Sequence, residues 1–109
     1  NLGIDMRAIG FCGDEVEMIG ESAVGRWLSD KKGLRAVIAS ENEFEKYAKK
    51  SYNRVGETGR ISKTKINVMT VYQSKGLEFT AVAVADGDMT ANEKYIAYTR
   101  ALKNLALIR

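Results

Sequence analysis

The sequence has no histidine, only one cysteine and no long apolar run. A single cysteine cannot close an internal disulfide, and without histidine the chain offers too few ligands for a transition-metal site. Cys12 lies in an apolar run, where we expect a buried structural thiol. No stretch approaches the roughly 18 apolar residues that a membrane-spanning helix needs, and no signal peptide opens the chain. We therefore expect a cytoplasmic protein with no membrane contact.

The length and composition are those of one globular domain. The 109 residues are 45% hydrophobic and 28% charged, which is typical of a soluble chain that buries a single core. The chain begins at Asn1 rather than at a methionine, and it ends at Arg109 directly after an apolar run. We interpret residues 1–109 as a single domain and as the C-terminal piece of a larger protein.

Five short apolar runs rich in Val, Ile and Ala predict strands. The runs are nearly continuous rather than alternating, which is typical of strands covered on both faces of a parallel sheet. They are Met6–Cys12, Leu34–Ala39, Ile66–Tyr72, Thr80–Ala85 and Leu105–Ile108.

Three amphipathic segments between these runs predict helices, because their apolar residues recur at helical spacing. The segments are Asp14–Asp30, Glu41–Lys50 and Ala91–Asn104. Each begins with two residues at the spacing of a capping box, in which each side chain satisfies a backbone N–H of the first turn. The pairs are Asp14 with Glu17, Ser40 with Glu43, and Thr90 with Glu93. Strands alternating with helices predict an α/β domain, with a mostly parallel sheet of about five strands flanked by helices.

A polar, basic segment, Ser51–Lys65, interrupts this alternation. Residues 49–65 carry six basic side chains against Glu57, a net charge of +5, whereas residues 1–30 carry two basic against six acidic side chains. A basic flank suits nucleic acid, but it is also typical of a solvated surface, and the sequence leaves both interpretations open. The basic residues are Lys49, Lys50, Arg54, Arg60, Lys63 and Lys65.

The stretch GETGR within this segment resembles a phosphate-binding loop only superficially. A Walker A loop needs a wider spacing between its glycines, followed by Gly-Lys-Ser/Thr, whereas here the second glycine is followed by Arg60. No Asp-Glu pair closes a predicted strand, as a magnesium-holding Walker B would. We therefore expect that this chain alone does not hydrolyse a nucleotide.

The stretch VYQSKGLEF, residues 71–79, joins two predicted strands. Loops beyond the carboxyl ends of parallel strands commonly bind ligands. Gly76 would let the backbone approach a ligand, Lys75 supplies a charge suited to phosphate, and Glu78 supplies an acceptor for a sugar hydroxyl. A plain connector could contain the same residues, so this chemistry alone does not decide between the two.

The stretch YIAYTRALKNLALIR, residues 95–109, contains an arginine on the predicted last helix. At about 100° per residue, Tyr95, Tyr98, Leu102 and Leu105 form a narrow apolar stripe, and Arg100 falls nearly opposite. We therefore expect Arg100 to point away from the sheet, either into solvent or toward a neighbouring domain.

Together, VMTVYQSKGLEFTAV and YIAYTRALKNLAL resemble motifs V and VI of the superfamily 1 helicases of the UvrD/Rep/PcrA type. Motif V covers about residues 68–80, motif VI about residues 95–105, and the whole resemblance covers Ile66–Arg109. It implies a RecA-like second motor domain, without its own Walker A, of an ATP-dependent DNA helicase that tracks single-stranded DNA. It also implies that ATP and Mg²⁺ are bound mainly by the N-terminal motor domain of the same parent chain.

The resemblance assigns roles to the nucleotide-binding residues. Gly76 and Glu78 would approach the nucleotide, with Glu78 on the ribose. Arg100 would be the catalytic arginine finger on the γ-phosphate, which stabilises the charge that develops during transfer.

The resemblance also assigns contacts with nucleic acid. Thr70 would touch the nucleic-acid backbone, assisted by Lys75. Tyr72 stands where the family often has histidine, and its ring could stack on a base. Thr80 replaces a frequent aspartate of the motif.

Two alternatives remain open. The chain has no room for the inserted 2B domain of UvrD and Rep, and this compact layout is similar to HelD, an ATPase that acts on RNA polymerase. The other alternative is a non-catalytic nucleic-acid-binding module that kept the fold and lost the motor activity.

Overall fold

A single parallel sheet organises the chain in the computed structural model, which describes residue 13 and residues 16–109. The sheet has six strands in the order β1-β6-β5-β2-β4-β3, and each neighbouring pair is parallel. The strands are β1 (Glu17–Ile19), β2 (Arg35–Ala39), β3 (Asn53–Arg54), β4 (Asn67–Thr70), β5 (Phe79–Ala85) and β6 (Ala101–Ile108). The predicted α/β class with a parallel sheet is confirmed, with six strands where about five were expected.

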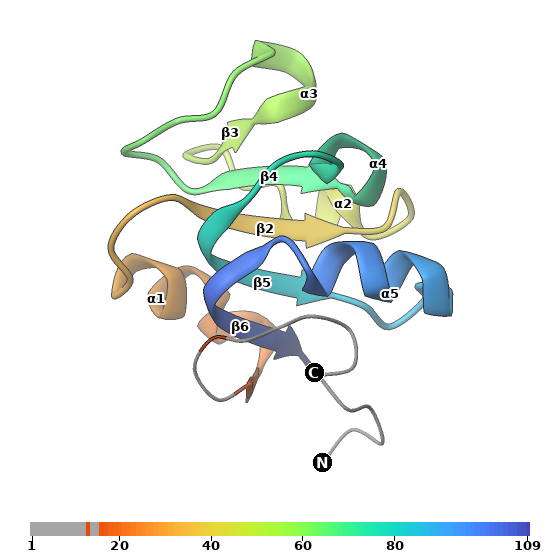
Figure 1. Cartoon of the computed structure of the whole chain (residues 1–109). Helices are drawn as coiled ribbons and strands as arrows, with labels where there is room; N and C mark the ends of the chain where they lie inside the picture. Colours follow the sequence, from red (N-terminus) through yellow and green to blue (C-terminus); the bar gives the residue numbers. More distant parts are fainter. Residues whose placement is uncertain (1–12, 14–15) are drawn as a thin grey trace.

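Short helices cover both faces of this sheet. They are η1 (Glu21–Ala23), α1 (Val24–Ser29), α2 (Phe44–Tyr47), α3 (Val55–Thr58), α4 (Val71–Ser74) and α5 (Ala91–Tyr98). Figure 1 shows α5 in front of the strands and α2 behind them. In the described part of the chain, no helix is long and apolar enough to cross a membrane.

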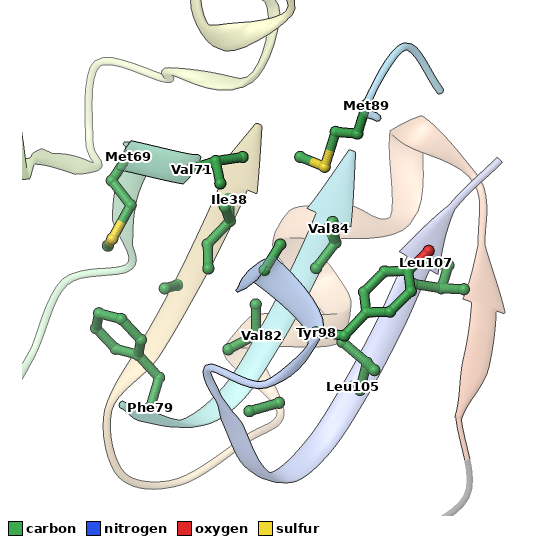
Figure 2. Close-up of a cluster of buried hydrophobic side chains, with 13 residues drawn as sticks. Ile38, Met69, Val71, Phe79, Val82, Val84, Met89, Tyr98, Leu105 and Leu107 are labelled. Atoms are coloured by element: carbon green, nitrogen blue, oxygen red, sulfur yellow. The ribbon is translucent and has the colours of Figure 1, made fainter. Parts of the chain in front are cut away.

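The core has two halves, one on each face of the sheet. Successive residues of β2 alternate between them, with Ile38 on the face covered by α4 and α5 and Val37 on the face covered by α1 and α2. Figure 2 shows the first half, where Tyr98 from α5 lies against the side chains of β5 and β6. Burial on both faces explains why the strands are continuous apolar runs in the sequence.

The predicted first helix, Asp14–Asp30, is wrong over its N-terminal part. Glu17–Ile19 forms β1, which pairs with the end of β6, and the α-helix begins only at Val24. Helical periodicity there was overridden by backbone hydrogen bonding to an open strand edge. Glu17 therefore caps no helix, and its carboxylate accepts from Trp27 Nε1 at 3.1 Å. The strand predicted at Met6–Cys12, with its thiol, and Asp14 lie outside the described residues.

The predicted last helix, Ala91–Asn104, ends early. Helix α5 stops at Tyr98 because Ala101 already pairs with Phe79 of β5. Its predicted capping box is confirmed: Glu93 N–H donates to the Thr90 hydroxyl at 3.1 Å, and Thr90 N–H donates to the Glu93 carboxylate at 2.9 Å.

The apolar stripe predicted for this helix is wrong in two of its four members. Tyr98 and Leu105 are buried, but Tyr95 and Leu102 are exposed by 51% and 56%. Leu102 lies on a strand rather than on the helix, so the helical angle does not describe it.

The predicted middle helix, Glu41–Lys50, is limited to the four residues of α2. The Ser40 hydroxyl accepts from Glu43 N–H at 3.3 Å, as predicted. Glu43, however, is itself the residue that precedes the helix, so the reciprocal half of the predicted capping box does not form.

The basic segment Ser51–Lys65 is structured, because it includes β3 and α3. The fully buried Asn67 of β4 holds this segment through side-chain hydrogen bonds. Asn53 Nδ2 donates to Asn67 Oδ1 at 2.8 Å, and Asn67 Nδ2 donates to the Ser62 and Arg35 carbonyls at 3.0 Å. This network ties the segment to the sheet at the start of β4.

Candidate functional site

The connection from β4 to β5 begins with a capped helical turn, α4. Thr70 accepts from Gln73 N–H at 3.4 Å, and Gln73 Oε1 accepts from Thr70 N–H at 3.0 Å, so the two residues form a capping box. Gly56 of α3 packs on the Gln73 side chain, since a Cβ there would lie 2.3 Å from Nε2. The turn that holds Thr70 is therefore supported from its own backbone and from α3. The sequence prediction ran the strand to Tyr72 and missed this cap.

Two further residues of the connection are required by the fold. Ser74 is fully buried, and its hydroxyl donates to the Val71 carbonyl at 2.6 Å. Gly76 has a φ of +80° with nothing near its missing Cβ. The left-handed backbone therefore requires glycine here, whatever approaches it from outside.

The side chains of Tyr72 and Lys75 are exposed beside each other on this turn. Tyr72 is 66% exposed, and the Lys75 ammonium lies 4.8 Å from the centre of its ring. The pair presents an aromatic face and a cation side by side. Such a combination can stack on a base and contact a phosphate.

Glu78 and Arg100 lie next to each other at the opposite end of the sheet. Each directly precedes a strand, β5 and β6, and the first residues of these strands, Phe79 and Ala101, are paired. The Phe79 N–H donates to the Arg100 carbonyl at 2.9 Å. Neighbouring strands lie about 4.8 Å apart, so an exposed carboxylate and a half-buried guanidinium share one edge.

The Arg100 side chain is held by the end of α5. Its Nε donates to the Ile96 carbonyl at 3.1 Å, and its Nη2 donates to the Thr99 hydroxyl at 3.2 Å. The carbonyl end of a helix favours a cation electrostatically. Because Arg100 lies beyond the last residue of α5, the helical-wheel angle used to orient it from the sequence does not apply.

The candidate residues thus form two groups rather than one. Thr70 is level with Ala85, because both pair with Ala39. Phe79 starts the same strand six residues earlier, which is about 20 Å along the sheet. Thr70 and Tyr72 lie at the carboxyl edge, whereas Glu78 and Arg100 lie at the amino edge. The expectation that the whole connection lies beyond the carboxyl ends is wrong for Glu78, because the chain must return to the start of β5 (Figure 1).

A buried polar cluster at the carboxyl edge was missed by the sequence prediction. Asp86, directly after β5, is 2% exposed and accepts from the Tyr98 hydroxyl and the Arg109 guanidinium. Burial raises the pKa of Tyr98, and its bond to Asp86 adds to this effect. The only sequence signal is an acidic residue directly after an apolar strand. The cluster ties β5, α5 and the end of β6 together.

A second acidic residue, Asp88, links β2 to the segment that follows β5. Its carboxylate accepts from the Ser40 hydroxyl at 2.6 Å and from Asn42 Nδ2 at 3.3 Å. The Ser40 bond is the main cause that lowers the pKa of Asp88. Among the described residues, no group of three or more acidic or cysteine side chains is arranged to hold a metal ion.

The comparisons with known proteins concern the segment that contains both groups. Residues 65–108 match the model of the UvrD-like helicase C-terminal domain, and all six candidate residues fall within this match. The resemblance to UvrD-like helicases is confirmed. This UvrD-like segment indicates a domain of the helicase motor type.

A solved structure has the same fold. The C-terminal domain of a possible DNA helicase from Lactobacillus plantarum WCFS1 superposes with a TM-score of 0.68 and 21% sequence identity. The superposition covers 94% of this chain and 80% of that chain. At this identity the likeness shows the fold alone. The comparison with curated proteins gives no match.

Proposed function

We propose that the chain is the second motor domain of an ATP-dependent DNA helicase or translocase. In this role it completes an ATP site that it shares with an N-terminal motor domain of the same parent chain, and it contacts single-stranded DNA. The observation that carries the proposal is the pairing of Phe79 with Ala101, which sets Glu78 beside Arg100 within a UvrD-like segment.

The residues at the amino edge suit one side of a nucleotide. Arg100 is a fixed cation for the γ-phosphate, and Glu78 is an exposed acceptor for a ribose hydroxyl. The chain has no phosphate-cradling loop of its own, and its described side chains include no cluster suited to Mg²⁺. This donor set fits a half-site, in which the partner domain holds Mg²⁺ and most of the triphosphate.

The chemistry supplied by bound ATP and Mg²⁺ is transfer of the γ-phosphoryl group to water. Arg100 donates to the phosphate oxygens as their negative charge grows, and such a finger contributes on the order of 10³–10⁵ in rate. Its bonds to Ile96 and Thr99 orient the guanidinium before the reaction, so little reorganisation is needed. Closure of the cleft brings Arg100 to the nucleotide and couples turnover to movement.

The residues at the carboxyl edge suit the strand. Thr70 keeps a hydroxyl hydrogen that can donate to a phosphate, and the exposed Tyr72 ring can stack on a base. Lys75 beside that ring can neutralise the next phosphate. Tyr72 lies on α4, Thr70 and Lys75 flank it, and Glu78 follows shortly after, so one short connection joins the nucleotide and strand contacts.

A HelD-like ATPase that remodels RNA polymerase complexes is the second candidate. The compact segment Ser51–Lys65 favours it, since this segment folds back on β4 through Asn53 and Asn67 and leaves no inserted domain. Both candidates use the same half-site and differ in the partner on which the motor acts.

The test uses the intact parent protein. Hydrolysis of ATP is measured with and without single-stranded DNA, followed by unwinding of a forked duplex and by release of DNA from RNA polymerase. We expect hydrolysis that single-stranded DNA stimulates, together with unwinding. Release from the polymerase without unwinding would favour the HelD-like function. Absence of ATP hydrolysis would leave a non-catalytic nucleic-acid-binding module.

A further inference from the structure

A groove runs along the face of the sheet that α1 and α2 cover, opposite the face of α4 and α5. It consists of two hollows of about 440 and 690 Å³. Both are lined by Gly25, Lys49 and Tyr52, so they adjoin each other. None of the six candidate residues of the nucleotide and strand sites lines either hollow.

The larger hollow is strongly basic. Arg35, Lys49 and Lys65 line it, and its described lining residues include no acidic side chain. Lys49 and Lys65 are exposed, and within the described part of the chain neither forms an ion pair. Their charges are therefore available to a ligand.

The third cation, Arg35, is fixed in place. Its Nη1 donates to the Leu28 carbonyl at 3.2 Å, and its Nη2 donates to the Thr64 carbonyl at 2.5 Å. These bonds join α1, β2 and the segment that precedes β4, and all three border the hollow. Elements that are distant in the sequence therefore build this hollow together.

The smaller hollow adds aromatic and hydroxyl groups. Its one acidic lining residue, Glu21, is paired with Lys46 at 2.7 Å and so contributes little negative charge. The Tyr52 hydroxyl lies 3.2 Å from where a Cβ of Gly25 would be. Burial raises the pKa of Tyr52 above its ordinary value of 10.0.

We propose that this groove binds the phosphodiester backbone of a nucleic acid. Open basic grooves with an aromatic side chain are the usual site for such a polymer, and two adjoining hollows extend further than a single phosphate needs. The contact is additional to the one at Tyr72 and Lys75, which lies on the opposite face of the sheet. The inference rests on the proposed function only in that the parent protein acts on nucleic acid.

The segment offers a matched control for the lysines of the groove. Lys50 and Lys63 also lie within residues 49–65 and are exposed, but they do not line either hollow. The double variants Lys49→Gln/Lys65→Gln and Lys50→Gln/Lys63→Gln remove the same charge. If a defined groove binds the nucleic acid, the two variants should bind it differently. If a diffuse positive surface binds it, they should behave alike.

The experiment measures binding of the intact protein, without nucleotide, to a fluorescent single-stranded oligonucleotide and to a duplex over a series of salt concentrations. Each lost phosphate contact reduces the salt slope by about 0.7 for single strands and about 0.9 for duplex. We therefore expect Lys49→Gln/Lys65→Gln to flatten the slope by about 1.4 or about 1.8, according to which form occupies the groove. The Lys50→Gln/Lys63→Gln control should retain the slope of the wild type.

Two results would overturn the proposal. Equal flattening in both double variants would show a diffuse charged surface, and an unchanged slope in Lys49→Gln/Lys65→Gln would show that the groove binds no backbone. Failure of the motor function is read separately, by ATP hydrolysis. If the protein hydrolyses no ATP but the salt slope of binding flattens only in Lys49→Gln/Lys65→Gln, the motor function fails and the proposed groove stands.

Discussion

At the scale of single residues, the stretch VYQSKGLEF divides into residues that build the connection and residues that it presents. Ser74 and Gly76 are fixed by a buried hydrogen bond and by a left-handed backbone. Tyr72, Lys75 and Glu78 are exposed. The exposure of polar side chains in this stretch was predictable, because charged residues stand between two apolar runs in the sequence. The sequence could not predict that Glu78 and Arg100 are neighbours, since that depends on the pairing of β5 with β6.

Tyr98 offers a prediction at the same scale. Tyr98→Phe removes a buried hydroxyl that donates to Asp86, and we expect a loss of about 1–3 kcal/mol in the free energy of unfolding. Urea denaturation at neutral pH measures it. Tyr95→Phe, on the exposed side of the same helix, is the control and should leave stability unchanged.

The same variant carries a pH dependence. Burial holds the pKa of Tyr98 above its ordinary value of 10.0, so above that pH the unfolded state releases a proton that the folded state keeps. Stability is therefore fully present below pH 10.0 and falls as the pH rises further. In Tyr98→Phe the fall above this pH should be shallower. A fall as steep as in the wild type would contradict the assignment.

At the scale of elements, β2, β4, β5 and the end of β6 were predictable, whereas β1, β3 and the helix ends were not. Val37 and Ile38 face opposite halves of the core, and burial on both faces leaves a continuous apolar run that the sequence displays. Helix ends depend on competition with strand pairing. Ala101 lies within the predicted last helix, but it pairs with Phe79 and belongs to β6. Glu17–Ile19 changes from predicted helix to β1 for the same reason.

The confirmed capping box of α5 gives a prediction for this scale. Thr90→Ala removes the acceptor for the Glu93 N–H and should lower the free energy of unfolding by about 1 kcal/mol. Thr90→Ser keeps a hydroxyl in the same place and should cost much less. The comparison is made by urea denaturation of the three proteins. Equal stability of Thr90→Ala and the wild type would show that the cap contributes nothing.

At the scale of the whole molecule, the sheet separates the two groups of candidate residues. Its amino edge presents Glu78 and Arg100, its carboxyl edge presents Thr70 and Tyr72, and the connection through α4 joins them. A domain built in this way can transmit a change at one edge to the other through a rigid sheet. The proposed role as half of a motor depends on this arrangement, because neither edge is a complete site by itself.

The most direct test of this account is the kinetics of Arg100→Ala in the intact parent protein. Lys103→Ala, an exposed cation on β6, is the control, and thermal unfolding checks that loss of the bonds to Ile96 and Thr99 leaves the fold intact. We predict that ATP binding is largely retained while DNA-stimulated hydrolysis falls by on the order of a hundredfold or more, because the interaction acts on the transition state. Turnover of Arg100→Ala close to that of the wild type would contradict the account.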